Sequence, residues 1–253
     1  MSRRESIRMS ALKALAAAAA ILIVAVSVFG DQEEYVPGSG KWEFGLTAGA
    51  AFPMGAFRNN LGTIGFNADL FIGRRLGHSP FSLGIDIYYM IYGFRSHDQN
   101  LSGDIPVQVE VDTSNNMLQG LIYLRCQPRR GRVRPYVEGL VGGSYLYTRT
   151  SISGTNFPWD EITSSTNFDD FTVCAGGGAG LDVHLSGGGR SADGTPKAEV
   201  RLDCKVRYLL GGRAQYLRSD SIVYDSERET FTYLFRESTT NLLSAQVGIS
   251  FNF

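Results

Sequence analysis

A histidine, a serine and a glutamate lie within one short stretch of the chain, at His184, Ser186 and Glu199. A serine nucleophile needs a nearby base to take its proton and an acid to orient that base, so these residue types suit hydrolysis. Ser186 also opens a glycine-rich segment, and the start of a turn is the simpler interpretation. The other two histidines, His78 and His97, lie in predicted connections, where we expect solvated surface residues.

Two further patterns could be mistaken for chemical sites. The run Gly176–Gly180 is not followed by Lys-Ser/Thr or by a helix signal, so it does not predict a phosphate-binding loop. Alternate glycines on one face of a strand instead leave room for long side chains opposite. Cys126, Cys174 and Cys204 lack the spacing of a metal site or a disulfide framework. We interpret them as small strand residues, with a single bridge as the alternative, and we predict no enzyme activity, no cofactor and no metal site.

Charge and the N-terminus limit the class of protein. The formal net charge is −1 and no large basic cluster is present, so we predict no nucleic-acid partner. Basic residues at Arg3, Arg4, Arg8 and Lys13 precede the uncharged run Ala14–Val28, which is typical of an export signal. Residues 1–30 are therefore predicted as a signal peptide cleaved near Ser27 or Gly30, and residues 31–40 as a short periplasmic segment. A retained helical anchor is the alternative.

The rest of the chain reads as strands in which apolar and polar residues alternate. In the last one, Val247, Ile249, Phe251 and Phe253 share an apolar face, and the residues between them are polar or small. Period-two alternation marks a strand with one apolar and one polar surface. No later apolar run is long enough for a spanning helix. The predicted strands are Lys41–Phe52, Gly62–Gly73, Phe81–Phe94, Asn116–Gln127, Val133–Arg149, Phe168–His184, Ala198–Leu210 and Asn241–Phe253.

The strand Ala198–Leu210 decides which face points inward. Charged residues occupy every second position from Glu199 to Arg207. A Lys or Arg facing lipid at the bilayer midplane costs about 2–4 kcal/mol, so the charges must point into a lumen and the apolar residues toward lipid. Charges in a narrow, dry interior have to be paired. The predicted lumen network comprises Glu43, Asp69, Asp86, Arg125, Arg134, Glu138, Asp182, Glu199, Arg201, Asp203, Lys205 and Arg207.

The predicted fold is all-β, an eight-stranded antiparallel up-and-down transmembrane barrel over residues 41–253. Such a barrel is just wide enough for side chains to fill, so we expect a filled core, with a narrow conducting path as the alternative. A soluble lipocalin-type barrel would invert the facing, against the Phe253 terminus and the aromatic residues near strand ends. Those aromatics would form membrane girdles. They are Trp42, Tyr136, Phe251 and Phe253 at one end and Phe94, Tyr147 and Phe168 at the other.

The connections between strands differ in length and charge. Outer-membrane barrels have short periplasmic turns and longer outer loops. The predicted outer loops are Pro53–Leu61, Arg95–Asn115, Thr150–Asn167 and Gly211–Thr240, and the inner turns are Arg74–Pro80, Pro128–Arg132 and Leu185–Lys197. The inner turns are rich in Arg, and the second and third outer loops carry acidic residues. Those carboxylates could bind divalent cations that bridge lipopolysaccharide, although solvated side chains are the simpler interpretation.

Together these features resemble the outer-membrane β-barrel superfamily that includes the OmpA transmembrane domain and small porin-like proteins. The resemblance covers residues 41–253 and is carried by the alternating strands, the turn Phe52–Phe57, the segment Arg134–Gly139 and the terminal Phe253. It implies location in the outer membrane of a Gram-negative-type bacterium, contact with lipid and lipopolysaccharide, and a C-terminal assembly signal at Val247, Ile249, Phe251 and Phe253 that the barrel assembly machinery reads. The chain stops at the barrel, so no peptidoglycan-binding domain is expected after it.

Three functional classes remain open at this point. The first is a structural or porin-like barrel. The second is an adhesin or receptor that binds an unknown partner through the long outer loops. The third follows from a likeness of His184, Ser186 and Glu199 to the His-x-Ser plus Glu arrangement of outer-membrane lipid A deacylases. The predicted periplasmic position of His184 opposes that third reading, because lipid A lies in the outer leaflet.

Overall fold

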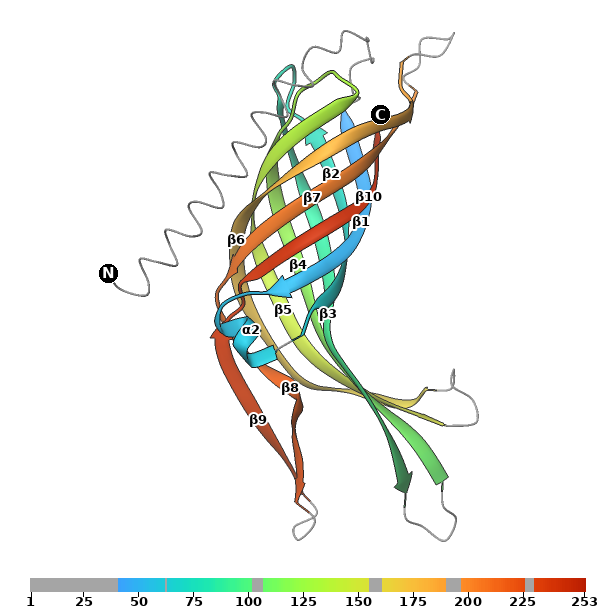
Figure 1. Cartoon of the computed structure of the whole chain (residues 1–253), viewed down its shortest axis with the longest axis vertical. Coiled ribbons are helices and arrows are strands. Elements are labelled where there is room, and N and C mark those ends of the chain that lie inside the picture. The colour runs from blue at the N-terminus through green and yellow to red at the C-terminus, as the bar shows by residue number, and fades with distance from the viewer. Residues whose placement is uncertain (1–40, 62, 102–106, 155–160, 190–196, 226–229) are drawn as a thin grey trace, which may run out of the picture.

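The computed structural model describes residues 41–61, 63–101, 107–154, 161–189, 197–225 and 230–253 (Figure 1). The predicted signal peptide and periplasmic segment, residues 1–40, lie outside these ranges. The elements are β1 (Trp42–Pro53), α2 (Ala56–Leu61), β2 (Gly65–Arg75), β3 (Phe81–Leu101), β4 (Val107–Cys126), β5 (Val133–Gly154), β6 (Glu161–Gly187), β7 (Glu199–Gly211), β8 (Arg213–Asp225), β9 (Thr230–Thr239) and β10 (Leu242–Asn252). In the described part of the chain, no helix is long and apolar enough to cross a membrane.

Eight strands close into a barrel in the order β1-β10-β7-β6-β5-β4-β3-β2. Each neighbouring pair is antiparallel, and β10 pairs with β1 along its length, from Glu43 opposite Asn252 to Pro53 opposite Leu242. Closure satisfies the backbone groups of the wall without an open edge, which is what a bilayer requires of strands that cross it. The predicted eight-stranded antiparallel barrel is therefore confirmed.

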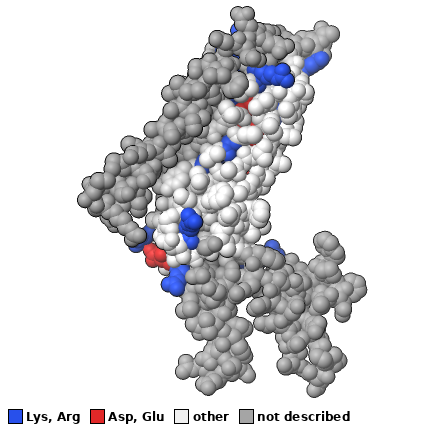
Figure 2. Space-filling model, in the orientation of Figure 1, with Lys and Arg blue, Asp and Glu red and all other residues white. Residues whose placement is uncertain are grey.

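The barrel is apolar outside and polar inside. Leu46, Ile122 and Val247 are each more than half exposed, whereas Asp203 and Arg201, on the inner face of β7, are fully buried. The wall between the two ends is largely white in Figure 2. A soluble lipocalin-type barrel would show the opposite facing, so that rival is excluded. The arrangement is that of a membrane-spanning barrel.

The strands extend beyond their predicted ends on one side of the barrel. The predicted loops 95–115 and 150–167 are mostly strand, because β3 continues to Leu101, β4 begins at Val107, β5 continues to Gly154 and β6 begins at Glu161. The predicted loop 211–240 also forms a two-stranded hairpin, β8–β9, that pairs with no barrel strand. All these extensions lie at the end of the barrel opposite the C-terminus (Figure 1). The loop prediction was wrong here because polar strands outside a bilayer need no apolar face.

One smaller sequence prediction was also wrong, and one alternative is excluded. Tyr136 was expected in an aromatic girdle, but its side chain is fully buried in the lumen, because it shares the inward parity of Arg134 and Glu138. All three cysteines are free, so the alternative of a single disulfide fails. Of the other girdle aromatics, Trp42, Phe251 and Phe253 are exposed at the end with short turns, and the side chain of Phe94 lies outside what the structure describes.

Candidate functional site: the interior of the barrel

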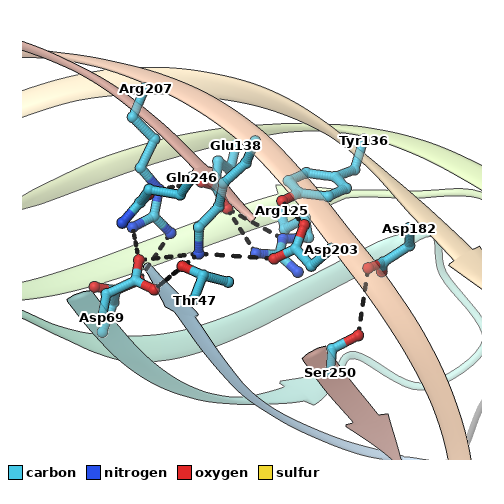
Figure 3. Close-up of polar contacts among 12 residues, drawn as sticks. Thr47, Asp69, Arg125, Tyr136, Glu138, Asp182, Asp203, Arg207, Gln246 and Ser250 are labelled. Atoms are coloured by element: carbon cyan, nitrogen blue, oxygen red, sulfur yellow. Dashed lines mark hydrogen bonds and ion pairs between the residues drawn. The ribbon is translucent and has the colours of Figure 1, made fainter. Parts of the chain in front are cut away.

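A network of ion pairs fills the middle of the barrel. Arg207 is its centre: Nε donates to Glu138 Oε1 at 2.6 Å, Nη1 donates to Asp69 Oδ2 at 2.6 Å, and Nη2 lies 2.8 Å from Asp86 Oδ2. Lys205 Nζ lies 2.9 Å from Asp69 Oδ2, and the hydroxyl of Thr47 donates to the same aspartate. Figure 3 shows Arg207, Glu138, Asp69 and Thr47 reaching one another from different strands of the wall. One cation on β7 thus connects β2, β3 and β5.

A second guanidinium extends the network toward the C-terminal end of the barrel. Arg125 Nη1 donates to Glu43 Oε1 at 2.5 Å, and its Nε and Nη2 donate to Glu138 Oε2 at 3.1 and 2.9 Å. Its guanidinium carbon lies 4.0 Å from the centre of the Tyr136 ring and 5.0 Å from that of Phe71. Arg125 is fully buried, and contact with aromatic faces stabilises a guanidinium removed from water.

A third cluster lies at the end with short turns. Glu199 accepts hydrogen bonds from Arg134 at 3.1 Å and from Arg201 at 2.5 Å, and its Oε1 is also 3.1 Å from His184 Nδ1. Asp182 accepts from Gln127 Nε2 at 2.6 Å and from Ser250 Oγ at 3.3 Å. The hydrogen bonds and ion pairs of this cluster and of Arg125 join β1, β4, β5, β6, β7 and β10, and Arg207 reaches β2 and β3.

Glycines on the inner face make room for the large side chains. A Cβ added to Gly180 would overlap the ring of Tyr136, and one added to Gly178 would lie 2.8 Å from Arg207 Cγ. The rings and guanidiniums therefore occupy the space that side chains at these positions would need. This is the arrangement expected from the glycine-rich run Gly176–Gly180.

The other half of the interior contains an apolar cluster that the sequence did not indicate, beside buried neutral polar side chains such as Gln119 and Ser144. Met90, Met117, Leu121 and Leu209 are buried in one cluster with Tyr88, on the side of the ion network away from the C-terminus. They occupy inward-facing positions of β3, β4 and β7. These positions lie on the side of Asp86, Tyr123 and Arg207 that is away from the C-terminus. Because the outer face is apolar too, alternation fades in these segments. The only available signal was strand parity, counted onward from the charged positions.

The helix α2 closes this apolar end. Phe57, its buried residue, packs edge-on against Tyr92 and Tyr216 with ring centroids 5.7 and 5.2 Å apart. Asn60 Nδ2 donates to Tyr216 Oη at 2.7 Å, and Tyr216 shares a 2.8 Å hydrogen bond with Ser238. The helix is thereby fixed to the base of the β8–β9 hairpin. The interior consists of ionic side chains, then a mixture of apolar and neutral polar side chains, then this aromatic cap.

The structure places all the predicted network residues inside the barrel, and each is at most 5% exposed. The set falls into two groups. The central ion pairs join Glu43, Asp69, Asp86, Arg125, Glu138, Asp203, Lys205 and Arg207, and the cluster near the short turns joins Arg134, Asp182, Glu199 and Arg201. Sequence reasoning missed Arg75, which was assigned to a turn but is buried and donates weakly to Gln127 Oε1 at 3.4 Å.

The possible catalytic group is only partly assembled. His184 and Glu199 are in contact, but Glu199 is also bonded to two arginines. Ser186 is exposed, and within the described residues its hydroxyl forms no hydrogen bond with His184. The described residues also contain no group of His, Cys, Asp and Glu side chains placed to hold a metal ion. The interior is thus arranged for packing and charge pairing.

No protein-family model matches the chain, and no curated protein matches it. Solved structures with a similar fold include Neisserial surface protein A, with 13% identity, 85% of this chain and 99% of that chain covered, and a TM-score of 0.42. The attachment invasion locus protein Ail of Yersinia pestis has 12% identity, coverage of 86% and 99%, and a TM-score of 0.34. A major outer membrane protein of Thermus thermophilus has 12% identity, coverage of 84% and 99%, and a TM-score of 0.38.

The facing of the side chains and the closure of the barrel identify the environment of this chain. An even number of antiparallel strands, an apolar outer band and a polar interior characterise the barrels of bacterial outer membranes. The chain is an outer-membrane barrel. Its short turns then mark the periplasmic end, and the extended strands and hairpin mark the extracellular end.

Proposed function

We propose that the protein is a non-conducting structural barrel of the outer membrane that carries an extracellular sheet. The observation that supports this most directly is the filled interior. Arg207 and Arg125 form ion pairs with carboxylates across the lumen. Leu121 and Leu209 are buried in the next section, and Phe57 covers the opening of the barrel. An ion would have to break paired charges and then pass between tightly packed, buried side chains.

Conductance across a planar bilayer tests the proposal. Folded protein, verified by a shift in gel mobility between unheated and heated samples, is expected to give no single-channel steps. Phe57→Ala is also expected to remain silent, because Met90, Leu121 and Leu209 still close the lumen beneath the cap. Stable conductance steps from folded wild-type protein would refute the proposal and favour the porin-like alternative.

A role in binding a surface partner is the second candidate, and the extended strands favour it. The pairing of β2 with β3 ends at Phe66 opposite Ile91, yet β3 to β6 remain paired with one another as far as Leu101, Val107, Gly154 and Glu161. A four-stranded sheet therefore stands beyond the barrel mouth. Replacing residues 96–111 and 152–165 with short turns should abolish cell adhesion while the heat-dependent mobility shift stays intact. Undiminished adhesion would argue against this candidate.

We further propose that the chain is not a hydrolase. Two observations support this. Ser186 is exposed at the periplasmic end, and the Glu199 carboxylate already accepts hydrogen bonds from Arg134 and Arg201. Ser186→Ala should leave the acylation of lipid A unchanged when the lipid is analysed by mass spectrometry from cells expressing each form. A gain of acyl chains in the variant would restore the hydrolase hypothesis.

A further inference from the structure

The periplasmic end of the barrel presents basic side chains on its surface. Lys41, Arg74, Arg129, Arg132 and Lys197 are all exposed there, and we call them the basic rim. They lie at the start of β1, the end of β2, the turn between β4 and β5, and the approach to β7. Figure 2 shows Lys and Arg on the surface at this end, the upper one in the view, and also at the opposite end, where acidic atoms lie beside them.

No acidic side chain balances the basic rim among the residues whose burial the structure describes. The carboxylates of Glu43, Asp182 and Glu199 lie at the same end, but they are 4% exposed or less and are bonded inside the lumen. The exposed acidic side chains, such as Asp169 and Glu237, lie at the extracellular end. Among the described residues, the exposed side chains at the periplasmic end therefore carry net positive charge.

Arg74 shows that the rim faces the membrane as well as the periplasm. It lies opposite Trp42 in the β1–β2 ladder, and its guanidinium carbon is 5.4 Å from the centre of the Trp42 ring. Trp42 is 43% exposed on the outer face, the position where tryptophan marks the boundary between acyl chains and headgroups. Its neighbour Arg75 points the other way, into the lumen, because successive strand residues alternate.

We propose that the basic rim is a binding surface for anionic phospholipid in the periplasmic leaflet, with Arg74 and Arg132 contacting headgroup phosphates. Guanidinium groups bind phosphate oxygens through paired hydrogen bonds, and basic residues beside a membrane attract anionic lipids. An acidic soluble partner would not require a guanidinium held at the level of Trp42. The inference uses the outer-membrane location and is independent of whether the lumen conducts.

Tryptophan fluorescence tests this directly, because Trp42 and Trp159 are the two tryptophans of the chain. In a Trp159→Phe background, Trp42 reports alone on its lipid neighbours. The protein is folded into phosphatidylcholine vesicles that contain equal mole fractions of brominated phosphatidylglycerol or brominated phosphatidylcholine. Quenching is expected to be stronger with the brominated phosphatidylglycerol, and each rim cation removed should lower the relative association of that lipid roughly fivefold.

Three single variants and one double variant distinguish lipid binding at the basic rim from a general effect of charge. Arg132→Gln leaves the contact between Arg74 and Trp42 in place, Arg74→Gln removes it, and both should reduce the preference. Arg213→Gln, at the extracellular end, is the matched control and should retain it. The preference should also fall as salt is raised. Equal quenching by the two lipids in wild-type protein, or an unchanged preference in the double variant Arg74→Gln/Arg132→Gln, would overturn the proposal.

Discussion

Replacing Arg207 with methionine should destabilise the barrel strongly. Arg207 is 1% exposed and lies within 2.8 Å of oxygens from Glu138, Asp69 and Asp86. Glu138 keeps Arg125 and Asp69 keeps Lys205 after the change, but Asp86 has no other ion pair within the described residues. Removing one member of a buried ion pair costs about 3–5 kcal/mol, because the other charge is left without compensation. We expect a loss in that range.

The assay is equilibrium unfolding in urea from lipid vesicles, followed by tryptophan fluorescence and by gel mobility of unheated samples. Asp86→Asn in the Arg207→Met background removes the stranded charge, so the double variant should regain part of the lost stability. Arg213→Met is the control: its ion pair with Glu237 is 3.5 Å long and solvent-exposed, and such pairs contribute about 0–1 kcal/mol. The reasoning is refuted if Arg207→Met matches this control, or if the double variant is no more stable than the single one.

Three further predictions concern the packing of the barrel and its assembly. Gly180→Ala places a methyl group against the Tyr136 ring and should cost about 1–3 kcal/mol in urea unfolding, whereas Gly120→Ala, with open space around it, should be nearly neutral. Phe57→Ala should speed amide hydrogen exchange in α2 while exchange in the barrel strands stays slow, because α2 takes no part in the hydrogen bonds between those strands. Unchanged exchange in α2 would show that packing of the Phe57 ring does not hold the helix. Phe253→Ala should slow assembly in cells, seen as unfolded protein in pulse-chase gels, if the terminal strand is the signal that the assembly machinery reads.

The facing of the barrel strands could be predicted from the sequence, apart from single residues such as Tyr136, because charged side chains are excluded from the lipid face. In β3, Leu83, Ile85 and Ile87 are half exposed to the lipid side, and Asp86 between them is fully buried. A period of two needs no knowledge of neighbouring strands. The identity of the lumen charges followed from the same rule, since a charged residue cannot share the lipid face at low cost.

The pairing inside the lumen could not be predicted in the same way. Arg207 and Asp69 are 138 positions apart in the chain, and the contact depends on barrel closure and on the stagger of the strands. The apolar cluster of the interior could not be predicted, because Leu121 and Ile122 are both apolar although one points inward and one outward. The position of Phe57 over the barrel opening could not be predicted, because a six-residue helix within a loop is too short to show a periodic pattern.

The charges of β7 also determine the register of the strand. Shifting a strand by one residue moves every side chain to the opposite face. In β7, such a slip would expose Lys205 and Arg207 to lipid in the middle of the wall, and Arg201 nearer the periplasmic end. At about 2–4 kcal/mol for each cation near the midplane, the two central residues alone would disfavour the slipped register by about 4–8 kcal/mol. Buried ion pairs often add little net stability compared with well-packed apolar side chains. The ion network is therefore better explained as the feature that makes the native register the only inexpensive one than as the main source of the barrel's stability.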